Sequence, residues 1–164
     1  MRRAGSSILA IVLILGTTLG WPPYTSAQKT TLPPTIIKAD MNPAAIRAQL
    51  RMAADLGRTA LRGLQSTPTD DSVPLDEGVV QAARDTYVLI RAAREGMQLK
   101  LERQKIPDPV LELTFKRLTD AWNLSRTPVD KLSWSFSRQD YITMSVRDLS
   151  RALQLVDQAL ILLP

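Results

Sequence analysis

Four arginines in the first half of the chain could bind an anionic partner. They are Arg47, Arg51, Arg58 and Arg62, and on a helix they fall within about sixty degrees of one another. We call this row the arginine stripe. Because guanidinium groups pair with carboxylates and phosphates, the stripe predicts a protein partner with an acidic surface or an anionic membrane surface. Asp55 is expected to pair with two of the arginines. The alternative is that these side chains only solvate an outer face.

The second candidate for contact with a partner is a pair of aromatic residues, Trp134 and Phe136, which alternate with serines. The favoured interpretation is that both rings fold over the end of a helical core beside the other aromatic side chains, Phe115, Trp122 and Tyr141. The alternative is that one ring stays exposed as the anchor for a partner, since tryptophan is enriched at interface hot spots.

The chain contains neither cysteine nor histidine. This composition excludes disulfides, cysteine nucleophiles, serine–histidine triads and metal sites that need either residue. An enzyme would need a carboxylate pair, a lysine or a tyrosine instead, and no carboxylate falls clearly on an inward helix face. We therefore expect no enzymatic activity, no catalytic residues and no cofactor.

Four carboxylates lie within eight residues of one loop: Asp70, Asp71, Asp76 and Glu77. Their spacing does not match the alternating ligands and distal glutamate of an EF-hand. Carboxylates just before a helix also complement its dipole. We therefore interpret the group as a helix start and predict no metal site.

The N-terminus is typical of an export signal. Arg2 and Arg3 precede an apolar stretch over residues 8–15, and small residues at 25–27 offer a cleavage point before Gln28. The apolar stretch is shorter than the roughly 20 residues that span a membrane. We predict a signal peptide over 1–27 and an extended linker over 28–41. The compartment would be the periplasm, or the thylakoid lumen or extracellular space in other hosts.

Capping residues and apolar periodicity predict the helices that position these side chains. Asn42, Asp108 and Ser137 are suited to precede a helix, and prolines follow the first two. The expected helices cover about 42–64, 76–103, 108–123 and 138–163. A short turn of helix is also expected after Arg126, where Thr127 and Asp130 form a capping box.

The last helix shows the clearest periodicity. Its apolar residues are spaced alternately by four and three positions: Ile142, Val146, Leu149, Leu153, Val156, Leu160 and Leu163. Such a stripe must be buried against partner helices. Residues 42–164 are therefore predicted to form an all-α, up-down-up-down antiparallel four-helix bundle. The long connection before the last helix leaves room for a crossing helix as the alternative.

Function follows from these features as an expectation. Beyond the signal, residues 28–66 carry six basic and two acidic residues, so the positive excess belongs to the first helix and its leader. We expect a non-catalytic interaction or accessory subunit of a larger envelope or membrane-associated assembly, and no nucleic-acid partner. The alternative is a bundle that binds a small apolar ligand or cofactor between its helices, but its candidate ligands Met52, Met97 and Met144 are expected to fill gaps in the core.

Overall fold

The computed structural model describes residues 37–130 and 137–163, and within them it confirms the all-α prediction. The four long helices are α1 (Pro43–Ser66), α2 (Glu77–Glu102), α3 (Pro109–Ser125) and α5 (Arg138–Leu162). A single helical turn, α4 (Thr127–Asp130), lies between α3 and α5. Each long helix begins and ends within two residues of its predicted bounds. The predicted signal peptide and residues 28–36 of the predicted linker lie outside the described residues.

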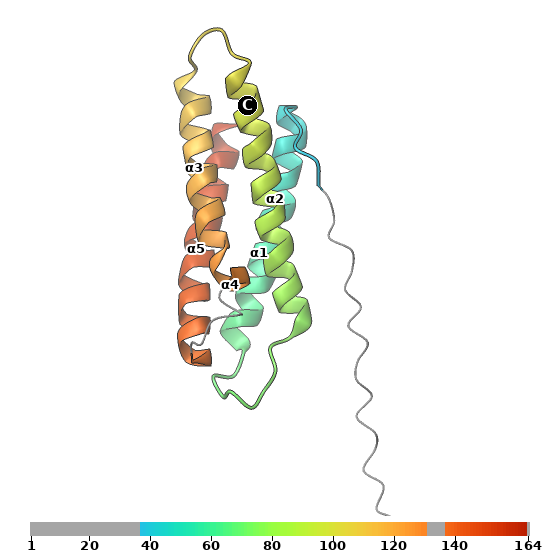
Figure 1. Ribbon diagram of the computed structural model, residues 1–164, viewed down its shortest axis with the longest axis vertical. Helices are drawn as coiled ribbons and strands as arrows, with labels where there is room; N and C mark the ends of the chain where they lie inside the picture. Colours follow the sequence, from blue (N-terminus) through green and yellow to red (C-terminus); the bar gives the residue numbers. More distant parts are fainter. Residues whose placement is uncertain (1–36, 131–136, 164) are drawn as a thin grey trace, which may run out of the picture. The chain divides into compact units, whose positions relative to one another are not determined.

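The long helices run up and down in turn, as Figure 1 shows. α1 packs against α2 and α5, and α3 packs against the same two helices, so the order around the bundle is α1, α2, α3, α5. This is the predicted antiparallel topology. As a result the α2–α3 loop lies at one end of the bundle and the α1–α2 loop at the other.

Side-chain caps fix where the helices begin. The Oδ1 atom of Asn42 accepts a hydrogen bond from the Ala44 amide at 3.0 Å, and Asp76 accepts one from Gly78 at 2.7 Å. Ser137 Oγ accepts from the Asp140 amide at 3.2 Å. Each bond satisfies a backbone amide that has no hydrogen-bond partner inside its helix. The helices therefore begin directly after these capping residues.

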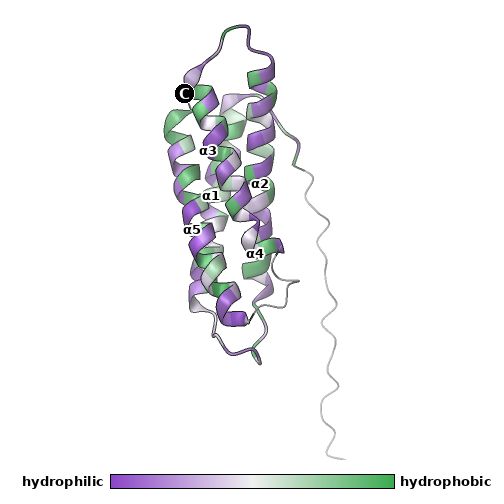
Figure 2. Ribbon diagram, turned by 60° about the vertical axis from the view of Figure 1, so that its left-hand side comes forward, coloured by the Kyte–Doolittle hydropathy of each residue, from purple (hydrophilic) through white to green (hydrophobic). Residues whose placement is uncertain are grey.

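The core contains the predicted apolar stripes, but each buried face is wider than its stripe. Figure 2 shows hydrophobic and hydrophilic positions alternating along the helices. Ile46, Leu50, Ile90, Leu149 and Val156 are completely buried. Small residues such as Ala54, Ala92 and Ala152 are also buried, because each long helix packs against two neighbours and not one.

One predicted placement in the core is wrong. Met52, expected to fill a gap, is 55% exposed, because it lies on the side of α1 opposite Leu50. Asp148 lies off the apolar stripe of α5 and is nevertheless only 9% exposed. The apolar stripe of α5 is narrow, so it does not show that other elements also cover the neighbouring side of this helix.

Three helices approach closely around Gly57. A Cβ atom at this position would lie 2.6 Å from Cδ2 of Leu153 on α5 and 3.2 Å from Cγ2 of Thr86 on α2. The backbone of Gly57 is ordinary helix, so the lack of a side chain here matters for the close approach of the neighbouring helices and not for backbone conformation.

The described end of the predicted linker lies against the bundle. Ile37 packs on the core cluster, and Gln49 donates a hydrogen bond to the carbonyl oxygen of Lys38 at 3.3 Å. A side chain at Gly96 of α2 would overlap the backbone carbonyl of Asp40. The segment around Asp40 can therefore pack on α2 at this position because residue 96 is a glycine. No helix within the described residues is long and apolar enough to cross a membrane.

Candidate interaction surfaces

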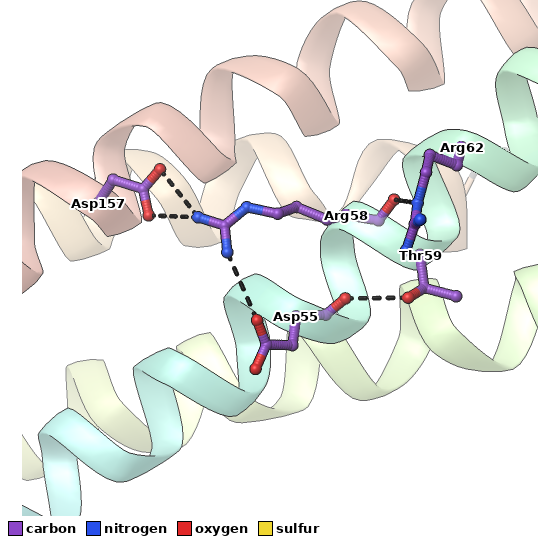
Figure 3. Close-up of polar contacts among 5 residues, drawn as sticks. All are labelled: Asp55, Arg58, Thr59, Arg62 and Asp157. Carbon is purple, nitrogen blue, oxygen red and sulfur yellow. Dashed lines mark hydrogen bonds and ion pairs between the residues drawn. The ribbon is translucent and has the colours of Figure 1, made fainter.

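The arginine stripe lies along the line where α1 meets α5, which we call the α1–α5 seam. Arg58 Nη2 donates to both carboxylate oxygens of Asp157 on α5, at 2.9 and 3.2 Å, and Arg58 Nη1 lies 3.4 Å from Asp55 (Figure 3). At one end of the seam, half-buried Arg47 donates to the main-chain carbonyl of Leu163, the residue that caps α5. Two of the four arginines therefore join one helix to the other.

The other two arginines of the stripe do not reach α5. Arg62 Nε donates to the carbonyl oxygen of Arg58 at 3.4 Å, within α1. Arg51 is exposed and has no ion pair among residues 37–130 and 137–163. Asp55 was expected to pair with both Arg51 and Arg58, but it reaches only Arg58. Among the described residues only Arg58 of the stripe has an ion pair, and replacing Arg51 removes neither an ion pair nor a hydrogen bond that holds α1 on α5.

Replacing Arg58 with alanine should destabilise the bundle only slightly. About half of each side chain in the Arg58–Asp157 pair remains in water, so the pair should contribute about 0.2–1 kcal/mol and less at high salt. Urea unfolding at low and high salt measures this. Arg151→Ala is the matched control, because Arg151 bonds only to Gln154 on its own helix. A loss above that range that persists at high salt would contradict an exposed ion pair.

Trp134 and Phe136 lie outside the described residues, so their predicted placement stays a prediction. Two of their expected neighbours, Phe115 and Trp122, lie partly buried between α2 and α3 and pack against the core cluster. The Arg94 guanidinium carbon lies 5.0 Å from the Phe115 ring centre and 5.2 Å from that of Trp122. Trp122 also stacks on Tyr87 with a centroid distance of 6.1 Å. Both rings are half-buried and serve to pack α3 against α2.

The third expected neighbour, Tyr141, lies beneath α4. Its hydroxyl donates to the carbonyl oxygen of Pro128 at 2.8 Å. Thr127 Oγ1 donates to Asp148 at 2.7 Å, two turns further along α5. These two bonds anchor α4 on α5. The carboxylate of Asp148 can be buried because it accepts from Thr127 and also from Arg147 Nε at 2.8 Å, since a buried charge needs hydrogen-bond donors.

Tyr141 should titrate at higher pH than a free tyrosine. Burial raises its pKa above the ordinary value of 10.0. Above that value the unfolded chain loses this proton while the folded chain keeps it, so stability falls as pH rises through the folded pKa. The absorbance of tyrosinate, taken as the difference between the parent and Tyr141→Phe, measures the midpoint. A midpoint at or below 10.0 would contradict the buried phenol.

The carboxylates of the α1–α2 loop mainly hold local structure. Asp70 accepts from the Ser72 amide at 2.9 Å, and this bond is the main reason why its pKa is lowered. Asp71 accepts from the amide of Arg138 at 3.2 Å, which ties the loop to the start of α5. Asp76 caps α2. Within the part of the chain that the structure describes, no group of three or more acidic residues could hold a metal ion.

Exposed hydrophobic side chains gather at one end of the bundle. Of the seven large hydrophobic residues that are exposed in the described chain, five lie in the α2–α3 loop or in the adjacent turns of α2, α3 and α5. We call this region the α2–α3 end and define it by Leu99, Ile106, Val110, Leu113 and Ile161. Ile106 and Ile161 are 79% and 82% exposed. Such side chains are the natural candidates for contact with a partner.

The sequence patterns did not single out the α2–α3 end. Ile106 lies between two predicted helices, beside prolines, where no periodicity indicates its exposure. Ile161 lies off the apolar stripe of the last helix, so its exposure could have been predicted. Single exposed apolar residues are common. Four of the five lie within residues 99–113, and the fold brings Ile161 of α5 to the same end.

Comparisons with family models, curated proteins and solved structures find no match to this chain.

Proposed function

We propose that this chain is a non-catalytic interaction module, an accessory subunit that docks on a larger envelope or membrane-associated assembly. Export rests on the N-terminal sequence, with its basic residues, apolar stretch and cleavage point. The observation that best supports docking is the gathering of exposed apolar side chains at the α2–α3 end. The proposed partner surface is anionic.

The distribution of these residues supports a contact surface at one end. The opposite end of the bundle has one large exposed hydrophobic residue among the described ones, Val73, and its loop is rich in carboxylates. Covering an apolar side chain gains about 25 cal/mol per Å² removed from water. A partner at the α2–α3 end would therefore gain from Ile106 and Ile161, whereas a partner at the other end would have little apolar surface to cover.

Co-purification from the native envelope fraction tests the proposal. The variant Ile106→Ser with Ile161→Ser removes two apolar residues from the α2–α3 end, and Met52→Ser with Val73→Ser removes two elsewhere. We expect the first variant to lose a partner that the second retains, with both variants as stable to heat as the parent. Equal recovery by both variants would contradict docking through this end, and turnover of a substrate by the purified chain would contradict a non-catalytic role.

The structure also sharpens the test of the arginine stripe. Reversing all four charges would break the contacts that Arg47 and Arg58 make with α5. Arg51→Glu alone changes the charge of the stripe without removing an ion pair from the described residues. We expect it to weaken capture of an anionic partner, while Arg151→Glu on α5 leaves capture unchanged. If the two variants behave alike, the stripe has no role in binding.

A further inference from the structure

The loops at the two ends of the bundle differ in charge. The loop between α2 and α3 contains Arg103, Lys105 and Asp108, next to exposed Ile106, whereas the loop between α1 and α2 contains three acidic residues and no basic one. In an antiparallel bundle each end has two helix N-termini and two C-termini, so the helix dipoles largely cancel. The difference between the ends therefore comes from their side chains.

The acidic residues nearest to Ile106 already have partners. Asp108 Oδ1 accepts from the amides of Val110 at 2.9 Å and Leu111 at 3.3 Å, at the positive end of the α3 dipole. Glu102 accepts from Gln98 Nε2 at 2.9 Å. No ion pair in the described chain involves Arg103 or Lys105. Both cations can therefore bind an external anion.

We propose that the α2–α3 end docks on the surface of an anionic phospholipid bilayer, with Ile106 inserted at the interface and Arg103 and Lys105 at the level of the phosphates. This inference rests on the proposed interaction function and names its partner. An apolar residue flanked by cations at an exposed bend suits a bilayer surface, where the apolar side chain enters the acyl boundary and the cations remain among the headgroups.

The chemistry of this loop favours lipid over an acidic protein. A protein hot spot is usually a set of contiguous side chains around an anchor that enters a pocket. Here Leu99 and Ile161 lie on different helices, α2 and α5, and exposed Ile106 lies in the loop between α2 and α3. A fluid bilayer can accommodate such dispersed apolar residues without a complementary shape.

Vesicle binding with a single fluorescent label tests this directly. The chain has no cysteine, so Ile106→Cys introduces a unique thiol for an environment-sensitive dye, and Val73→Cys provides the matched control at the opposite end. The protein is expressed from the full-length gene and purified after any processing that the cell carries out. It is then mixed with vesicles of phosphatidylcholine alone or with added phosphatidylglycerol.

We expect a blue shift of the dye at position 106 only with phosphatidylglycerol, decreasing with salt, and none at position 73. Arg103→Glu with Lys105→Glu should weaken binding by more than tenfold, because each cation near an anionic surface contributes about fivefold. Ile106→Ser should weaken it by about tenfold. Arg84→Glu with Arg151→Glu makes the same change in net charge elsewhere and should have little effect.

Two results would overturn the inference. Binding that is equal for both lipid mixtures, or for the two double reversals, would show that the α2–α3 end does not recognise anionic lipid. An absence of vesicle binding by a chain that still co-purifies with an envelope protein through Ile106 would leave the proposed function standing and replace lipid with an acidic protein. An absence of both would remove the proposed function as well.

Discussion

Replacing Leu149 with alanine is expected to lower the free energy of unfolding by about 2–5 kcal/mol, the range for a completely buried leucine. Leu149 has no exposed surface and belongs to a cluster with Leu64 and Ala83, so residues of α1 and α2 surround the cavity that the substitution leaves. Rigid neighbouring helices cannot close such a cavity, and both transfer and packing energy are lost. Urea unfolding measures the change.

Ile161→Ala provides the control for this prediction. It lies on the same helix but is 82% exposed, and its truncation should change the free energy of unfolding by less than about 0.5 kcal/mol. Similar losses for the two variants would mean that Leu149 does not lie in the core, and the packing described for α5 would be wrong.

Enlarging Gly57 to leucine should destabilise the bundle by about 3 kcal/mol, the upper part of the usual range for overpacking. The first added carbon would already lie 2.6 Å from Leu153 Cδ2 and 3.2 Å from Thr86 Cγ2. Leu153 can turn its end away, but the further atoms of a leucine at position 57 must separate α1 from both neighbours. Thermal unfolding and urea unfolding both report the loss.

The intermediate substitution makes this prediction specific. Gly57→Ala gains about 1 kcal/mol of helix propensity while meeting the same first contact, so its net effect should be far smaller than that of leucine. Thr59→Leu, an exposed neighbour on α1, controls for adding a large side chain to this helix. If Gly57→Leu is as stable as Thr59→Leu, the helices do not approach as closely as described.

Local signals predicted the elements and their order. Asn42, Asp76, Asp108 and Ser137 each precede a helix, and each cap involves only residues within three positions of it. Because capping and periodicity are local, they can be recognised from the sequence. Short connections between α1, α2 and α3 then favour antiparallel neighbours, which explains why the topology could also be predicted.

Contacts between distant residues could not be predicted. The partner of Arg58 was expected to be Asp55 on its own helix, and the chain also supplies Asp157, ninety-nine positions away. Trp122 packs against the core cluster, but its contact with Arg94 on α2 had no signal in the sequence. Helical periodicity gives the face of the helix on which a side chain lies, but it does not give the element that packs against that face.

The same limit applies to the candidate surfaces. The sequence placed the positive excess of residues 28–164 on the first helix and its leader, and the fold uses Arg47 and Arg58 of that helix to hold α5. The exposed apolar residues come from two segments, residues 99–113 and the end of α5, which the bundle brings to one end. A loop residue such as Ile106 has no periodicity, so its 79% exposure had no signal in the sequence.

The central claim is that the α2–α3 end is covered by a partner in the native envelope, and thiol reactivity measures this most directly. A chain with Cys at position 106 and a second chain with Cys at position 73 are treated with a permeant thiol reagent, in the native envelope fraction and after purification. We expect position 106 to react much more slowly in the envelope than after purification, and position 73 to react at the same rate in both. Equal reactivity of position 106 in the two preparations would contradict the claim.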